Sequence, residues 1–485
     1  MKTVSSDQFG SRGPEGLLNF LRFVQESAIE SGEPLIASIS LRVRDLDPLA
    51  VLQSIHEPDE PHLYLERGNT AVSGAESVAR LDCTGEERFE KIRRFISQWS
   101  DRFVATGDLD GWFSGPLFFQ AFSFSETANP AATVFVPKWQ VCRTESECVA
   151  VANLRVEAET DLKAEAERIL RAHANFSEPS GFDPPHSDFP QTLQVRSEEG
   201  ALFQERVQKA LEIIQTNSIS KVVLSRWMEI EAETNFQPLE ILRRLREVFS
   251  DCFTFSYSRG EGSSWIGATP ERLIRVAGRD FQTEALAGST PRGRDSTEDS
   301  ALASRLLASE KDLREHKHVV EAIRAGLEGM AEVIRVGHHP HLLRLSNIQH
   351  LRTPIEGVSK PEYSILDFAE RLHPTPAVCG VPGEKADHLI GELEPFERRL
   401  FTGFLGWQKP SGEGELVVAL RTARITGKKA RLFAGAGIVE KSDPVGEWRE
   451  TEAKLDAMAG AIFAKRSRKE VVSEAETKED KGYSE

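Results

Sequence analysis

The sequence predicts a mixed α/β fold of the α+β type, in one large domain or two. Short apolar runs are numerous, helical segments are fewer, and the two do not alternate as they do in a regular βαβ protein. The chain has 485 residues, of which 39% are hydrophobic, and this is enough to bury an extensive core. A many-stranded unit with a few packing helices is therefore expected.

Apolar periodicity places the elements of the N-terminal half. Residues 15–30 have helical spacing, and residues 35–43 alternate between apolar and polar side chains as a strand does. A second helix is predicted over residues 86–99. Further short strands are predicted within residues 62–65, 71–73, 111–124, 132–141 and 149–156. No polar cluster stands out in this half, which is interpreted as scaffold.

The C-terminal half begins after a proline-rich segment, residues 174–191, which is predicted to be a linker or long surface loop. A helix over residues 201–215 and a strand over residues 219–230 follow. Two strands are expected within residues 263–276, joined through Thr269-Pro270-Glu271. The later elements are, in order, a glycine turn at Ala287-Gly288-Ser289, a long helix from about Ser300, a short strand carrying His350, a rigid loop over 372–382, a strand ending at Arg421, a glycine turn at Gly435-Ala436-Gly437 and a helix opening at about Glu447.

Charge and cysteine content exclude several classes of function. The formal net charge of −16 argues against a surface for nucleic acid or for an anionic membrane. The five cysteines are scattered and form no CxxC motif, so neither a disulfide framework nor a zinc site is indicated. No apolar run approaches a membrane span and no signal peptide is evident, so a reducing cytoplasm is the expected location.

The most informative segment is the predicted C-terminal helix together with the glycines before it. Glu447, Glu450 and Lys454 have the spacing i, i+3 and i+7, which places them on nearly one helix face. Two carboxylates and an ammonium beside a glycine turn can hold a divalent cation and an anionic ligand. The alternative is an ordinary solvated pair, since Glu450 and Lys454 have the favoured i, i+4 order.

Five further residues each have a structural and a functional interpretation. Lys221 lies either at a sheet edge or away from water, where a lysine can act as a base. Glu271 is either a turn carboxylate or a buried acid with a raised pKa that protonates a leaving group. Glu315, His350 and Arg421 are ordinary surface, structural or ion-pairing residues unless they face one site.

A set of motifs in chain order resembles the chorismate-utilising enzymes, a family that includes isochorismate, salicylate, anthranilate and aminodeoxychorismate synthases. The motifs are KVVLSR, GATPERL, LAGS, SEKDLREH, IQHL, HPTPAVCG, ALRTA, AGAGIV and GEWRETEAK, and they cover about residues 201–465. This resemblance implies one large unit of two stacked, mainly antiparallel β-sheets with helices outside. It divides the chain into a divergent N-terminal half (1–195), a catalytic half (196–466) and a disordered charged tail (467–485).

The resemblance also implies a Mg²⁺ site and a binding site for chorismate. Glu315 and Glu450 match the family's metal ligands, and Glu447 matches a position that supports them through or beside metal-bound water. The substrate-binding positions hold the carboxylates of chorismate or close over its ring. They are Gly288, His350, Ala377, Phe401, Arg421, Gly435 with its neighbouring amides, and Lys454.

The catalytic positions implied by the resemblance are Lys221 and Glu271. Lys221 would remove a proton from the water that attacks C2, and Glu271 would protonate the C4 hydroxyl as it leaves. Anthranilate synthases typically have glutamine in place of this lysine, so water is the expected nucleophile, although aminodeoxychorismate synthases also carry a lysine. Ala377 and Phe401 match isochorismate synthases, whereas salicylate synthases have threonine and tyrosine there.

The predicted function is that of an Mg²⁺-dependent isochorismate synthase, closest to those of menaquinone biosynthesis. The alternatives are a salicylate synthase, an isochorismate synthase of a siderophore pathway, and a non-catalytic protein that binds an anionic metabolite in the same pocket. Chorismate is the expected small-molecule partner. No glutamine amidotransferase subunit, nucleic acid or membrane is expected to bind, and the chain is expected to be a monomer.

Overall fold

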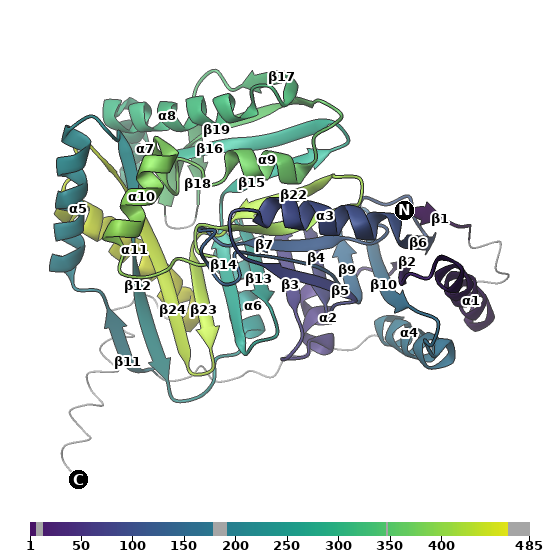
Figure 1. Ribbon diagram of the computed structural model, residues 1–485. Helices are drawn as coiled ribbons and strands as arrows, with labels where there is room; N and C mark the ends of the chain where they lie inside the picture. The colour runs from purple at the N-terminus through teal and green to yellow at the C-terminus, as the bar shows by residue number, and fades with distance from the viewer. Residues whose placement is uncertain (6–12, 178–191, 346–347, 464–485) are drawn as a thin grey trace, which may run out of the picture.

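The computed structural model describes residues 1–5, 13–177, 192–345 and 348–463. These residues form two large β-sheets that face one another, with helices packed on their outer sides (Figure 1). Strand pairing is antiparallel except where β6 pairs with β1 and β2. The α+β class and the two stacked, mainly antiparallel sheets are confirmed.

The larger sheet has 14 strands and contains the strand that carries Lys221. In spatial order the strands are β1 (Lys2–Thr3), β6 (Phe103–Gly107), β2 (Leu35–Val43), β10 (Cys148–Val156), β9 (Trp139–Arg143), β4 (Thr70–Ala75), β3 (His62–Arg67), β13 (Phe253–Ser258), β14 (Ser263–Thr269), β23 (Thr422–Thr426), β24 (Lys429–Val439), β12 (Lys221–Ala232) and β11 (Thr192–Ser197), with β20 (Gly380–Val381) also paired to β12. The N-terminal strands end at β3, where β13 continues the same sheet.

The smaller sheet has 10 strands, again from both halves of the chain. In spatial order they are β17 (Ala331–Val336), β19 (Ile348–Ser359), β16 (Asp280–Pro291), β15 (Arg272–Ala277), β22 (Gly414–Val418), β21 (Phe404–Gln408), β7 (Phe118–Phe122), β8 (Ala132–Val136) and β5 (Ala79–Cys83), with β18 (His341–Arg344) paired to β19. The chain passes from the larger sheet to the smaller one between β14 and β15, at Pro270-Glu271.

Helices cover the outer side of each sheet. Those of the described residues are α1 (Pro14–Ser31), α2 (Pro48–Ile55), α3 (Arg88–Asp101), α4 (Leu162–Ser177), α5 (Gly200–Gln215), α6 (Pro238–Val248), α7 (Ser296–Ala308), α8 (Glu310–Leu327), α9 (Ile365–Leu372), α10 (Gly383–Leu393) and α11 (Pro444–Phe463). Helices α3, α8 and α9 bury apolar faces on the smaller sheet, and α5, α6 and α11 do so on the larger one (Figure 1). None of these helices combines the length and the apolar character that crossing a membrane requires.

The core between the sheets is largely aromatic. Phe119 and Trp407 of the smaller sheet pack with Phe255, Trp265 and Phe433 of the larger one in a single buried cluster. Aromatic side chains bury large apolar areas, so this cluster supplies much of the hydrophobic free energy that holds the sheets together. Since its members come from both halves of the chain, neither half has a complete core alone. The division of the chain at residue 195 stays a prediction.

The two glycine turns predicted from the sequence are wrong, because the glycines lie within strands. Strand β24 continues without interruption through Gly435 and Gly437, which lie opposite Ser225 and Val223 of β12. Gly288, with φ of 77°, lies in a β-bulge of β16, where the register with β19 shifts. The glycines in β24 provide space: a Cβ on Gly437 would lie 3.0 Å from Lys221 Cε.

Three helix boundaries also differ from the predictions. The long helix expected from Ser300 is two helices, because Ser309 has extended backbone angles and its side chain accepts a hydrogen bond from Asp312 N, which caps α8. Helix α11 begins at Pro444, a residue suited to a first turn, and not at Glu447. Helix α4 extends through residue 177, so the predicted linker begins later than residue 174; residues 178–191 and the predicted tail lie outside the described residues.

Candidate active site

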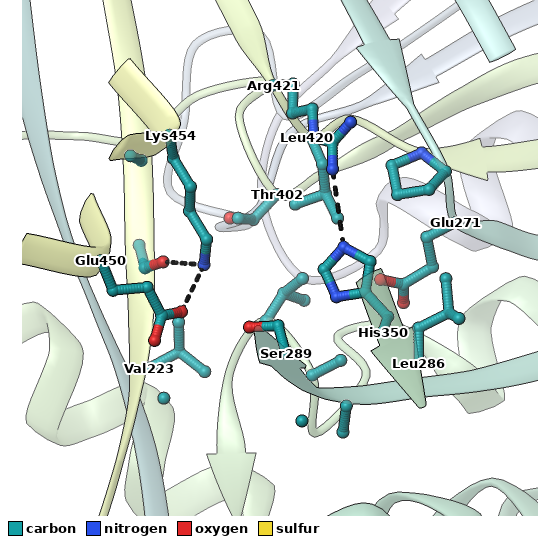
Figure 2. Close-up of a pocket in the computed structure, with 18 of the residues that line it drawn as sticks. Val223, Glu271, Leu286, Ser289, His350, Thr402, Leu420, Arg421, Glu450 and Lys454 are labelled. Atoms are coloured by element: carbon teal, nitrogen blue, oxygen red, sulfur yellow. Dashed lines mark hydrogen bonds and ion pairs between the residues drawn. The ribbon is translucent and has the colours of Figure 1, made fainter. Parts of the chain in front are cut away.

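A cavity of about 150 Å³ lies between the two sheets and brings together distant parts of the C-terminal half. All of the site residues predicted from the sequence line it, except Glu447. Figure 2 shows Lys454 and Glu450 on one side of the cavity, and Arg421, His350 and Glu271 on the other. Polar groups therefore surround a small enclosed space from opposite directions, as they do in sites for small charged molecules.

Lys221 is the first residue of β12 and is buried. It is paired on both sides, with Val439 of β24 and Val381 of β20, so the interpretation as a residue at a sheet edge is wrong. Its Nζ lies 2.8 Å from Oε1 of Glu315, which comes from α8. Burial raises the pKa of Glu315, but Lys221, Lys311 and Lys454 together outweigh this effect, and the pKa of Glu315 is lowered.

Glu271 lies where the chain crosses between the sheets, and its side chain is buried. Burial, together with the negative charge of Glu284, raises its pKa to about 8. The Thr375 hydroxyl donates a hydrogen bond to Oε1 at 3.3 Å, which offsets part of this shift. Glu271 therefore keeps its proton at neutral pH and can donate it to a group in the cavity.

Helix α11 presents an ammonium and a carboxylate at the opposite wall. Lys454 Nζ donates to Glu450 Oε1 at 2.7 Å and to the carbonyl oxygen of Gly435 at 2.8 Å (Figure 2). The i, i+4 pair thus exists, but both residues also line the cavity. Beyond Leu432, no described strand pairs with the other edge of β24, and this part of the strand borders the cavity.

A second cationic group enters from the end of the smaller sheet. Arg421 has φ of 47°, a left-handed conformation that turns the chain after β22. Its Nη2 donates to Nε2 of His350 at 3.5 Å, and its Nη1 donates to Sγ of Cys252 at 3.6 Å. Burial, with Arg421 and Lys454 nearby, lowers the pKa of His350 well below its usual value, so the imidazole is neutral at pH 7.

The predicted metal ligands form a carboxylate-rich corner. Glu447 is buried beside the cavity without lining it, and Lys311 Nζ lies 3.9 Å from its Oε1. Burial and the charge of Glu450 raise the pKa of Glu447 to about 7, and Glu315 adds to the effect. Glu315, Glu447 and Glu450 thus lie near one another beside the cavity, and carboxylate oxygens are the ligands that a hard cation prefers.

These carboxylates are not gathered into a closed cage. In the parts of the chain that the structure describes, no three His, Cys, Asp or Glu side chains are arranged around one point as ligands. Mg²⁺ ordinarily takes one or two protein carboxylates and completes its shell with waters and substrate oxygens. The residues present therefore fit Mg²⁺ better than a metal that requires an all-protein site.

Apolar residues form part of the remaining wall of the cavity. Phe401 is buried, stacks on Phe433 with ring centroids 5.3 Å apart, and faces the same cavity as Ala377. Two hydroxyl-bearing residues that line the cavity, Ser289 and Thr402, were missed from the sequence. Thr375 was missed as well; it does not line the cavity, but it donates a hydrogen bond to Glu271. Ser289 and Thr375 lie within the motifs LAGS and HPTPAVCG, and these motifs could have identified them. Thr402, with φ of 61°, lies outside these motifs.

Comparisons with known proteins agree with this geometry. The family model described as chorismate binding enzyme matches residues 22–463. A salicylate biosynthesis isochorismate synthase of Pseudomonas aeruginosa is 32% identical over 454 residues, which cover 92% of this chain and 95% of that protein. The isochorismate synthase MenF of Bacillus subtilis is 31% identical over 464 residues, which cover 90% and 96% of the two chains.

Solved structures show the same fold. MenF of Escherichia coli, described as a menaquinone-specific isochorismate synthase, superposes with a TM-score of 0.74 at 24% identity, over 91% of this chain and 99% of that one. The chain belongs to the chorismate-binding enzyme family. The relatives that match it over nearly their whole length are isochorismate synthases, which are isomerases.

Proposed function

We propose that this enzyme is an isochorismate synthase that converts chorismate to isochorismate by attack of water at C2 and loss of the C4 hydroxyl. The observation that carries the proposal is the pairing of a buried amine, Lys221, with a buried neutral acid, Glu271, in one cavity. Addition of water at one carbon and loss of hydroxide at another require a base and an acid at the same time. The full-length relatives named above support the same activity.

In this proposal Lys221 and Glu271 have complementary tasks. Lys221 takes a proton from the water that attacks C2 of the ring, and to do so the ammonium that is paired with Glu315 in the structure must first lose a proton and become the neutral amine. Glu271 gives its proton to the C4 oxygen, because hydroxide is a poor leaving group without protonation. Thr375 holds the Glu271 carboxyl in position through its hydrogen bond. The ring double bonds shift between the two carbons, so the product is an isomer of the substrate.

The two carboxylates of chorismate account for the basic groups of the cavity. Arg421 and Lys454 approach from opposite walls and attract a dianion, while neutral His350 supports Arg421 without adding charge. A substrate that fills this cavity would displace water from it, which strengthens these charge interactions and fixes the ring against the acid and the base. We also assign contact with the substrate to Gly288 and Gly435, which line the cavity from β16 and β24.

Mg²⁺ is the cofactor in this proposal. Glu315 and Glu450 would hold it, with Glu447 supporting them, and the bound ion would neutralise a substrate carboxylate. The nearness of these three carboxylates at one side of the cavity supports this assignment.

Two residues favour release of isochorismate over further elimination to salicylate. Ala377 and Phe401 line the cavity, and neither carries a hydroxyl that could assist departure of the enolpyruvyl group. We propose the menaquinone pathway for the product, because the match to B. subtilis MenF spans nearly both chains. A salicylate or siderophore pathway is the alternative, favoured by the equally long match to the P. aeruginosa protein.

A product assay tests the proposal. Purified protein is incubated with chorismate and Mg²⁺, and isochorismate, salicylate and aminated products are separated by liquid chromatography. Isochorismate is expected from the wild type, and Lys221→Ala and Glu271→Gln should each reduce its formation by about 10²- to 10⁴-fold. Salicylate as the main product would replace the proposal with the alternative. Chorismate binding without turnover would indicate a binding protein.

A further inference from the structure

A second cavity, of about 80 Å³, opens between the two sheets at a different place from the candidate active site. It lies beside the hairpin between β13 and β14 and the turn before β8. Three arginines line it, Arg259, Arg399 and Arg424, against a single acidic residue, Glu261. None of these residues belongs to the candidate active site.

The positive charges of this second cavity are only partly compensated. Arg259 pairs with Glu261 and lies 3.9 Å from Asp82, and Arg399 lies 3.4 Å from a carboxylate of Glu397. Arg424 makes no ion pair with any described residue, and its Nε is buried without a hydrogen-bond partner there. A buried guanidinium donor left unpaired is costly unless a ligand satisfies it.

The neighbours of Arg424 in the sheet help to explain why it has no ion pair among the described residues. On β23 it lies directly opposite Trp265 of β14 and Arg431 of β24. Arg431 is neutralised by Glu229 at 2.7 Å, so that carboxylate is already engaged. Burial, and the charges of Arg399 and Arg431, lower the pKa of Arg424, and Glu261 offsets part of this shift.

We propose that this second cavity binds a small oxyanion, a carboxylate or a phosphate group, between Arg424, Arg399 and Arg259. Guanidinium groups bind both kinds of anion through paired hydrogen bonds. Ser263 also lines the cavity and has a hydroxyl suited to a remaining oxygen, whereas the hydroxyls of Ser123 and Thr133 already donate to the Pro130 carbonyl and to Asp82. The cavity has about half the volume of the candidate active site, so the ligand is smaller than chorismate or enters by its anionic group alone.

Titration calorimetry at constant ionic strength tests the proposal, with inorganic phosphate and malonate as the two probes. Saturable binding of at least one probe to the wild type is expected. Arg424→Met should weaken it by about tenfold or more, the effect of losing one charged hydrogen bond. Arg431→Met is the matched control, since Arg431 is the cross-strand neighbour but has its own carboxylate, and it should bind as the wild type does.

The outcomes separate clearly. Binding of phosphate alone or malonate alone supports the site and identifies its ligand class. Absence of saturable binding to the wild type, or equal affinity in Arg424→Met, would overturn the proposal, as would an equal loss in Arg431→Met. Thermal unfolding checks that each variant is folded. Arg399→Met, at a half-exposed position, gives a second test and should also weaken binding.

Discussion

At the scale of single residues, the candidate active site depends on keeping two titratable groups in opposite states. Glu271 is neutral because it is buried near Glu284, while Glu315 is charged because Lys221 lies against it. Both residues are glutamates, but their environments differ. Glu271 is a carboxylic acid that can donate a proton, and Glu315 is a carboxylate that pairs with cations. Burial, more than residue type, assigns the roles.

Glu271→Gln should remove the proton donor while preserving the shape of the side chain. In the wild type, the rate should fall as pH rises through about 8, because Glu271 then loses the proton that it must donate. The variant should be about 10²- to 10⁴-fold slower and should lack this decline. The measurement is kcat/KM for chorismate against pH. An unchanged alkaline limb in the variant would assign that limb to another group.

Stability gives an independent check on the same residue. The pKa of Glu271 is about 8 in the folded protein against an ordinary value of 4.5, so the folded state retains a proton that the unfolded state loses. The contribution of Glu271 to the free energy of unfolding is therefore complete below about pH 4.5 and is lost as pH rises through about 8. Denaturant titrations of wild type and Glu271→Gln should diverge over that interval, with the variant less sensitive to pH.

Ala377→Thr tests which product the cavity wall selects. The new hydroxyl would stand beside the ring and assist elimination of pyruvate, so the variant should produce salicylate that the wild type does not. Salicylate fluorescence and a coupled pyruvate assay measure this directly. No increase in either product would show that this position does not decide the outcome.

At the scale of elements, β12 and β24 place Lys221. Gly437 lies across from β12, and its missing side chain leaves the space that the lysine occupies beside Glu315. Residues Glu394 and Arg398, both buried, fix the same region, because Glu394 accepts a hydrogen bond from Ser225 N and Arg398 donates to the carbonyl of Val223.

Gly437→Ala should displace the lysine without unfolding the protein. The added Cβ would lie 3.0 Å from Lys221 Cε and 3.1 Å from Glu315 Oε1, so the ion pair must shift. A misplacement of this size should reduce kcat/KM on the order of 10²-fold. Gly391→Ala is the control: it has open space around it in α10 and should leave activity unchanged while adding about 0.5–1 kcal/mol of stability. Equal activity in both variants would contradict this account.

Sequence patterns identified about half of the strands and the positions of the site residues, but not all of the geometry that joins them. Periodicity and motif order suffice to place Lys221 on a strand and Glu271 between two strands. They did not show that the two strands on either side of Glu271 lie in different sheets. They also did not show that Gly435 and Gly437 create space within a continuous strand. Such features depend on neighbours far away in the chain, which local patterns do not encode. Helices α2, α4, α6, α9 and α10 were not predicted at all.

At the scale of the whole molecule, the cavity exists because the side chains between the two sheets differ from one part of the interface to another. Aromatic packing holds them together along most of the interface, and charged residues occupy the part where β12, β16 and β24 come close. Because both sheets draw strands from both halves of the chain, the N-terminal half is needed to complete the surface against which the site is built.

Removal of the metal should lower the stability of the folded protein as well as its activity. EDTA should abolish turnover and Mg²⁺ should restore it. Mg²⁺ at 100 times its Kd should also stabilise the fold by about 2.7 kcal/mol, because the unfolded chain has no comparable site. Thermal unfolding with and without Mg²⁺ measures this effect, which should be smaller in Glu450→Gln and unchanged in Glu392→Gln, an exposed control on α10. Full activity in chelator would remove the metal roles from Glu315 and Glu450.

The central claim is that water, activated by Lys221, becomes the new hydroxyl of the product while Glu271 expels the old one. The most direct test is to run the reaction in heavy-oxygen water and to analyse isochorismate by mass spectrometry. One heavy oxygen should enter each product molecule at C2, and neither Lys221→Ala nor Glu271→Gln should form labelled product at a comparable rate. Unlabelled isochorismate, with the original hydroxyl moved within the substrate, would contradict the account.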